Sequence, residues 1–382
     1  MLKTIANSDI QNTQCNLNYA LVTAIKNNNV GAVLTALAAG ASPNAVDDNG
    51  MSALQLATFM GYAECVKLLL ASGANVETVD LDEWSSLMYA ADNGRAGCIK
   101  LLLAAGADVN KADFEAESGL MRAVRKGHTG CAKLLLAAGA NINAIDNDGT
   151  SSLMFAVDKG QESCVKLLLD SGAEVNAVAN NGESSLMKAA ANGRLSCIRL
   201  LLAAGAEVNA VDCNGVSSLM LATEQERPEC IRRLLAAGAD ARAVDYNGQN
   251  ALSRAVDKGN AKCIKMLLAG GADPNTGLSG AVSKCRKGLI TLLLAAGADP
   301  SVGLAFVTRT ATIQLLLEHG GDLGKGLATA AALGRIASVK LLLKNGADPH
   351  LGITAMAELS VPGSEHAAIA ALLRMASQPT SR

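Results

Sequence analysis

Apolar and polar residues follow one another in a pattern that returns every 33 residues along most of the chain. Between Asp146 and Val178, a turn dipeptide precedes a serine pair and a short apolar segment, which breaks at Gly160. A second apolar segment follows, from Val165 to Leu169. Segments of this length with one apolar face are typical of short helices that pack on a neighbour. The pattern therefore predicts a turn followed by a pair of helices.

The period is set by a glycine that recurs at equal steps, each time followed by alanine. These glycines are Gly40, Gly73, Gly106, Gly139, Gly172, Gly205, Gly238 and Gly271. A period of 33 residues with a turn and two helices is typical of the ankyrin repeat, and the chain resembles that family from about Asn18 to Met375. The resemblance implies an all-α solenoid with β-hairpin fingers, built from about twelve stacked repeats whose neighbours bury one another's apolar faces.

Four segments follow from this organisation. Residues 1–17 are polar and predict an N-terminal leader or cap, and residues 18–275 carry the repeats with fingers. From residue 276 to 375 the repeats are shorter, because the next equivalent glycines follow at steps of 26, 23 and 26. We expect these repeats to lack fingers and to end in a C-terminal cap, with a turn over Asp273–Leu278. Residues 376–382 form a polar tail.

A side-chain cap is predicted at the start of the first helix in repeats two to eight. Serine and asparagine oxygens accept hydrogen bonds from the unpaired amides of a first helical turn. The ankyrin family usually has the motif TPLH here, whereas this chain has SSLM in four repeats. Methionine replaces the histidine, so we expect apolar packing instead of the family's polar network. The predicted caps are Ser52, Ser85, Ser118, Ser151, Ser184, Ser217 and Asn250.

Seven of the ten cysteines stand in the repeat register, which argues against a disulfide set. Equivalent positions on stacked helices lie about 8–10 Å apart, beyond the roughly 7 Å limit on the Cα separation of a disulfide. Each cysteine precedes the apolar stretch of a second helix, where a small buried residue fits. We expect inert, reduced thiols with no metal or redox role at Cys65, Cys98, Cys131, Cys164, Cys197, Cys230 and Cys263.

Composition disfavours several classes of partner and location. Lys plus Arg number 33 against 35 for Asp plus Glu, so no bulk charge draws the chain to nucleic acid or to an anionic membrane. The first 16 residues lack the apolar core of a secretory signal. The longest apolar runs, such as 288–298, fall short of the 18 residues that span a bilayer. We expect a soluble cytoplasmic protein, monomeric on its own and without membrane insertion.

Motifs of catalysis and cofactor binding are missing from the sequence. There is no GxSxG and no HExxH, and Gly324-Lys325-Gly326 lacks the leading glycine and the hydroxyl residue of a phosphate-binding loop. The four histidines are far apart in the array. We therefore expect no enzyme activity, no cofactor and no metal.

Function is expected in the columns that differ between repeats, since the shared columns build the stack. By resemblance to the family, these columns lie at the finger tips and on the exposed side of the first helix. Six of the nine aromatic residues fall in them, and exposed apolar clusters, tryptophan, tyrosine and arginine are frequent in binding sites. The predicted partner-binding residues are Phe59, Met60, Leu81, Trp84, Tyr89, Phe114, Arg122, Arg125, Phe155 and Tyr246.

Some of these residues have an alternative interpretation. Tyr89 and Phe155 are equally placed to fill the groove between neighbouring first helices. The third and fourth repeats have Glu83 and Ala116 where other finger tips have glycine. This departure is typical either of a functional site or of drift in a tolerant loop.

Further predictions concern the partner and the function. Arg122, Arg125 and Lys126 form a basic spot, which favours an acidic partner segment. The preferred function is a noncatalytic scaffold or adaptor that binds a protein on the concave face of repeats two to five. One alternative is a regulatory or inhibitory subunit of a partner enzyme. Another is a piece of a larger protein with a catalytic domain elsewhere, against which a start methionine and capped ends argue.

Overall fold

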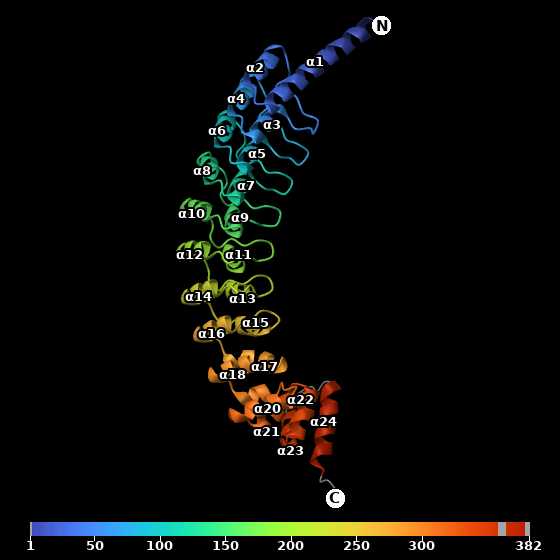
Figure 1. Cartoon of the computed structure of the whole chain (residues 1–382), viewed down its shortest axis with the longest axis vertical. Helices are drawn as coiled ribbons and strands as arrows, with labels where there is room; N and C mark the ends of the chain where they lie inside the picture. Colours follow the sequence, from blue (N-terminus) through green and yellow to red (C-terminus); the bar gives the residue numbers. More distant parts are fainter. Residues whose placement is uncertain (1, 358–363, 379–382) are drawn as a thin grey trace. The chain divides into compact units, whose positions relative to one another are not determined.

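The computed structural model describes residues 2–357 and 364–378, with side chains described from residue 13 onward and not at residue 364. The chain forms two bodies, an N-terminal body (Met1–Glu207) and a C-terminal body (Val208–Arg382). The described residues form 24 helices and no paired strand (Figure 1). The expected helical solenoid is therefore observed.

In the N-terminal body the helices form two layers. Each odd-numbered helix packs on the next odd-numbered one, and the even-numbered helices do the same. We call α3, α5, α7, α9 and α11 the inner helices, and Figure 1 shows a loop projecting beyond each of them, away from the even-numbered helices. The helices are α1 (Leu2–Lys26), α2 (Val30–Ala38), α3 (Ala53–Met60), α4 (Ala63–Ala71), α5 (Ser86–Asp92), α6 (Ala96–Ala104), α7 (Gly119–Lys126), α8 (Thr129–Ala137), α9 (Ser152–Lys159), α10 (Glu162–Asp170), α11 (Ser185–Ala191) and α12 (Leu195–Ala203).

The first helix is longer than expected. We predicted a polar leader before a helix that starts near Asn18, whereas α1 already begins at Leu2. The segment contains neither proline nor glycine, so nothing in its backbone chemistry ends the helix before Lys26.

The core of each repeat depends on one leucine of the second helix. In the triple-leucine stretch of α10, Leu168 is completely buried, while its neighbours Leu167 and Leu169 are partly exposed. The same middle position is buried at Leu69, Leu102, Leu135 and Leu201. Burying such a side chain stabilises the fold by roughly 1.5–3 kcal/mol. The register cysteines are buried beside it, as predicted.

The predicted caps are present at the start of the inner helices. The Ser85 hydroxyl accepts a hydrogen bond from the Met88 amide at 3.3 Å. In return, the Ser85 amide lies 3.4 Å from the Met88 sulfur, a weak acceptor. Met88 is buried in the core, as the expected apolar packing requires, and its sulfur in addition completes a capping box. The same box forms in α7, α9 and α11.

The loops between repeats carry single bridges instead of paired strands. Each loop holds one isolated antiparallel bridge, and we call these segments the bridge loops. In the N-terminal body the bridges join Val46 to Ser52, Val79 to Ser85, Ala112 to Ser118, Ile145 to Ser151 and Val178 to Ser184; in the C-terminal body they join Val211 to Ser217 and Val244 to Asn250.

The C-terminal body continues as helix pairs. After Asn250 the described residues contain no bridge. The turn expected over Asp273–Leu278 is wrong, because α17 starts there with Asp273 as cap and Pro274 as first residue. The helices are α13 (Ser218–Glu224), α14 (Pro228–Ala236), α15 (Ala251–Lys258), α16 (Ala261–Ala269), α17 (Pro274–Ser283), α18 (Lys287–Ala295), α19 (Pro300–Leu304), α20 (Thr310–Glu318), α21 (Leu323–Ala332), α22 (Ile336–Lys344), α23 (Pro349–Ala357) and α24 (Ser364–Ser377).

The last helix packs against α21, α22 and α23. The tail expected at 376–382 lies outside the described residues from 379 onward. None of the helices in the described part of the chain combines the length and the apolar character needed to cross a membrane.

Candidate functional site

The second and third bridge loops are each closed by one aspartate. One carboxylate oxygen of Asp80 accepts from the Asp82 amide at 3.0 Å and from the Trp84 amide at 2.8 Å. Asp113 binds the amides of Glu115 and Glu117 in the same way, at 3.0 and 2.8 Å. Each loop is thus closed from within, so the side chains at its tip point into solvent.

The departures from glycine at these tips have a measurable backbone consequence. Glu83 and Ala116 have φ of 59° and 60°, while the glycines at the equivalent position of other loops, such as Gly50 and Gly149, have φ of 79° and 76°. The turn is therefore kept, but a residue with a β-carbon adopts a left-handed conformation that costs about 1–2 kcal/mol. The missing glycine can be read from the sequence. That the turn forms without glycine could not be predicted from it.

Two predicted residues at these tips are strongly exposed. Leu81 is 88% and Phe114 is 60% exposed. They stand at equivalent positions of adjacent loops, so an apolar partner group can touch both. Phe59 and Met60, at the end of α3, are also exposed, though less so.

Trp84 and Tyr89 are packed together and are only partly exposed. Their ring centroids lie 5.1 Å apart, and the Tyr89 ring meets Phe59 edge-on at 5.9 Å. The Tyr89 hydroxyl donates to the second oxygen of Asp80 at 2.5 Å. Burial raises the pKa of Tyr89, and the bond to Asp80 raises it further. Tyr89 therefore packs between Phe59 of α3 and Trp84, with part of its surface still exposed.

The two predicted arginines continue this row. The Arg122 guanidinium carbon lies 3.3 Å from the centroid of the Trp84 ring, and that of Arg125 lies 5.5 Å from the Phe155 ring. Such stacking is worth about 0.5–2 kcal/mol. Phe59, Tyr89, Trp84, Arg122, Arg125 and Phe155 thus form a continuous set across α3, α5, α7 and α9, which we call the aromatic–arginine row.

The basic spot that we expected at these arginines is neutralised within the protein. Arg122 is buried, forms an ion pair with Asp113 and lies 3.2 Å from the Glu117 carboxylate. Arg125 pairs with the other oxygen of Glu117 at 2.5 Å. The arginines therefore hold the loop to the helices and offer little unpaired positive charge.

Tyr246 belongs to the C-terminal body and is described there by itself. It is 77% exposed in the bridge loop Val244–Asn250. Its amide donates to the Asn214 carbonyl at 3.0 Å, and its ring passes close to Gly215. It is thus an exposed aromatic side chain on a backbone fixed by the preceding loop.

A second exposed column was not predicted from the sequence. The bridge residues Val46, Ile145 and Val178 are each more than half exposed. A β-branched residue recurs there in the repeat register, and that recurrence was the available signal. Together with Leu81 and Phe114, these residues make the bridge loops apolar as well as polar.

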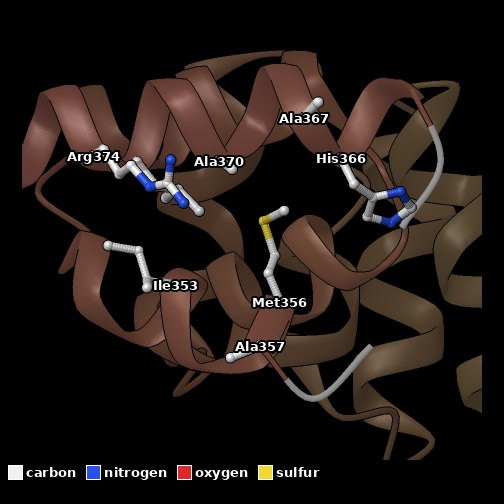
Figure 2. A pocket seen from close by; sticks show the side chains of 8 residues that line it. Ile353, Met356, Ala357, His366, Ala367, Ala370 and Arg374 are labelled. Carbon is white, nitrogen blue, oxygen red and sulfur yellow. The ribbon is translucent and has the colours of Figure 1, made fainter. Parts of the chain in front are cut away.

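A cavity of about 320 Å³ lies between α23 and α24. Figure 2 shows Met356 pointing between the two helices, with His366 and Arg374 at opposite ends. His366 Nε2 lies 3.0 Å from the Ala332 carbonyl oxygen. The rest of the lining is mainly alkyl, which gives this cavity few polar groups to orient a ligand.

Chemical groups for metal binding are not assembled in the part of the chain that the structure describes, where no three His, Cys, Asp or Glu side chains converge. Burial raises the pKa of the seven register thiols, which disfavours the reactive thiolate.

Comparison with known proteins agrees with this architecture. A family model for ankyrin repeats in three copies matches residues 2–80, 21–113, 87–179, 120–212 and 186–277. The human ASB11 ankyrin repeat domain is 28% identical, with a TM-score of 0.53, over 57% of this chain and 96% of that chain. The ankyrin repeat domain of Bcl-3, a member of the IkappaB protein family, is 27% identical, with a TM-score of 0.52, over 58% of this chain and 99% of that chain. No curated protein matches the sequence.

Proposed function

Because the chain belongs to the ankyrin repeat family, we propose that it is a noncatalytic scaffold or adaptor that binds a partner protein on its bridge loops and inner helices. Ankyrin repeats are protein–protein interaction modules. On this proposal the 24 helices form twelve repeats. The bridge loops serve as the fingers of residues 18–275, and the shortened repeats of 276–375 complete the stack.

One observation carries the proposal. Leu81 and Phe114 are large apolar side chains, 88% and 60% exposed, at equivalent places on adjacent loops. Exposing such groups has no benefit for the folded monomer, and exposed apolar groups that gather in one place usually mark an interaction site. Both residues are presented by loops that their own aspartates close, so a partner meets a surface that is already ordered.

The aromatic–arginine row connects these loops to the inner helices. Arg122 joins the third bridge loop, through Asp113, to the ring of Trp84 in the second bridge loop. Trp84 and Tyr89 are therefore positioning residues, while Leu81, Phe114, Phe59 and Met60 provide contact area. An interface of about 800 Å² per partner extends over several adjacent repeats of the N-terminal body.

The proposal also includes location and assembly state. We place the protein in the cytoplasm as a monomer that meets its partner there. The ten free cysteines support a reducing compartment, because seven of them are buried in register without a disulfide.

The test is affinity capture with the full chain from an extract of its native cells. We expect a specific protein to be retained by the wild type and lost with Leu81→Ala/Phe114→Ala. The matched control is Val30→Ala/Leu34→Ala, which removes exposed apolar groups of α2 instead and is expected to keep the partner. Retention of the same protein by all three forms contradicts the proposed surface.

A further inference from the structure

Charged side chains at the bridge-loop tips point to the chemistry of the partner. Five exposed carboxylates stand on four consecutive bridge loops of the N-terminal body, and among the described residues no donor forms a hydrogen bond to their side-chain oxygens. Among the described residues, no basic nitrogen lies within the 4.0 Å ion-pair distance of any of them. The five are Asp48, Asp82, Glu83, Glu115 and Asp148.

The basic side chains of the same region are in the opposite situation. Every lysine and arginine of the inner helices lies at ion-pair distance from a carboxylate, which belongs to a neighbouring loop or helix except at Lys159, whose partner Asp158 precedes it in α9. These pairs are Arg122 with Asp113 and Glu117, Arg125 with Glu117, Lys126 with Asp92, Lys159 with Asp158, and Lys188 with Glu183. The charge left without a partner in the four bridge loops and the inner helices is therefore negative.

Apolar groups lie among these carboxylates. Leu81 directly precedes Asp82 and Glu83, and Phe114 directly precedes Glu115. Ile145, which is also exposed, belongs to the loop that carries Asp148. A partner that covers Leu81 and Phe114 brings its flanking residues next to the unpaired carboxylates. Acidic flanking residues are repelled there, whereas lysine or arginine finds an opposite charge.

We infer that the partner docks through a basic segment in which lysine or arginine alternates with large apolar side chains. This inference rests on the proposed function and specifies its partner. It reverses the expectation of an acidic partner, because the arginines that suggested one are already paired. The five carboxylates are spread over four loops, and no metal-binding group forms among the described residues, so a protein segment fits them better than an ion.

The probe is a library of random 16-residue peptides displayed on phage and selected on the full chain. Peptides enriched by the wild type are sequenced, synthesised and titrated in parallel against three variants. The tip variant, Asp82→Asn/Glu83→Gln/Glu115→Gln, removes three charges without removing any hydrogen bond. The outer variant, Glu64→Gln/Glu162→Gln/Asp170→Asn, removes three exposed charges from α4 and α10. The third is Leu81→Ala/Phe114→Ala.

We expect the enriched peptides to contain an excess of lysine or arginine together with large apolar residues. Their affinity should fall about tenfold or more with the tip variant and little with the outer variant. Added salt should weaken binding to the wild type more than binding to the tip variant.

The outcomes separate the two proposals. If the peptides bind the alanine variant as well as the wild type, the surface itself is wrong and the proposed function fails with it. If they lose the alanine variant but are acidic, or bind the tip variant undiminished, the inference is overturned while the proposed function stands. The inference is also overturned if selection on the wild type yields no peptide that is both basic and apolar and that binds the tip variant more weakly.

Discussion

The guanidinium of Arg122 lies against the Trp84 ring, with its central carbon 3.3 Å from the ring centroid. These residues belong to adjacent repeats, 38 positions apart in the chain. Arg122 also forms an ion pair with Asp113, the residue that closes the third bridge loop. One buried cation of α7 thus connects the two loops that carry the exposed Leu81 and Phe114.

Replacing Arg122 with methionine should therefore destabilise the N-terminal body. Breaking a buried ion pair by removing one partner costs about 3–5 kcal/mol. We expect the lower end, about 3 kcal/mol, because Glu117 keeps Arg125 and Asp113 keeps two amide donors. Trp84 is the only tryptophan, so urea unfolding followed by its fluorescence reports this region directly.

The control for this substitution is Arg199→Met, which removes an exposed arginine 3.9 Å from Glu162. It should change the free energy of unfolding by about 0–1 kcal/mol. Equal effects of the two substitutions would contradict the structural role of the buried pair. Arg122→Lys should recover only part of the loss, because lysine cannot stack and bridge with a planar fork.

The repeat frame could be derived from the sequence because each of its devices is local. Ser85 as a cap and Gly73 after the second helix are short-range features, and their recurrence every 33 residues averages out the exceptions. The start of α1 at Leu2 was missed because no repeat precedes it for comparison. The start of α17 was missed because the register is lost where the repeats shorten.

The candidate site could be predicted only as a set of columns. Variation between repeats located Leu81 and Phe114, and both are exposed. It could not show that Arg122 is buried, since a positive charge in a variable column has the same appearance whether it faces solvent or an aspartate nine residues earlier. Side-chain pairing across repeats depends on geometry that one-dimensional periodicity does not contain.

Two leucines provide a test of the division between frame and surface. Leu168→Ala removes a completely buried side chain of α10 and should lower the free energy of unfolding by about 2–5 kcal/mol. Leu81→Ala makes the same chemical change at a side chain that is 88% exposed, and we expect an effect within about 0.5 kcal/mol. Chemical denaturation measures both, and a large loss at Leu81 would show that the tip is part of the core.

Substituting glycine for the left-handed residues at the loop tips should remove their backbone strain. Glu83 and Ala116 have φ near 60°, which costs a residue with a β-carbon about 1–2 kcal/mol. Glycine removes that cost, but it also raises the conformational entropy of the unfolded chain, which lowers the free energy of unfolding by about 0.4–1 kcal/mol. We therefore expect Ala116→Gly to stabilise the N-terminal body by about 0.5 kcal/mol, measured as a rise in the thermal midpoint.

The reverse substitution, Gly149→Ala, tests the same argument in the fifth repeat. An added β-carbon would lie 2.7 Å from the Asn180 side-chain oxygen and 2.8 Å from the Asn180 backbone nitrogen. Both the positive φ and this close approach oppose it, so we expect a loss of about 2 kcal/mol. If alanine is tolerated at position 149 without loss, the turn does not require a left-handed residue, and the proposed gain at Ala116 has no basis.

The register thiols should make the protein sensitive to alkaline pH. Burial raises the pKa of Cys131 above its ordinary value of 9.0. Above pH 9 the unfolded chain therefore loses this proton while the folded chain keeps it. The unfolded state then binds fewer protons, so the free energy of unfolding falls as pH rises, by up to about 1.4 kcal/mol per pH unit for each thiol. Below pH 9 this contribution to stability is fully present.

The substitution Cys131→Ala isolates one thiol from the other groups that titrate at high pH. At pH 7 the variant is expected to be less stable than the wild type, because a buried side chain is truncated. At pH 10 this difference should narrow by about 1 kcal/mol, because the wild type alone has lost the contribution of that thiol. Leu135→Ala, which truncates a buried side chain of the same helix that does not titrate, should give a difference from the wild type that does not change with pH. Urea titrations at the two pH values measure both, and a constant difference for Cys131→Ala would show that its thiol ionises as readily in the folded protein as in the unfolded chain.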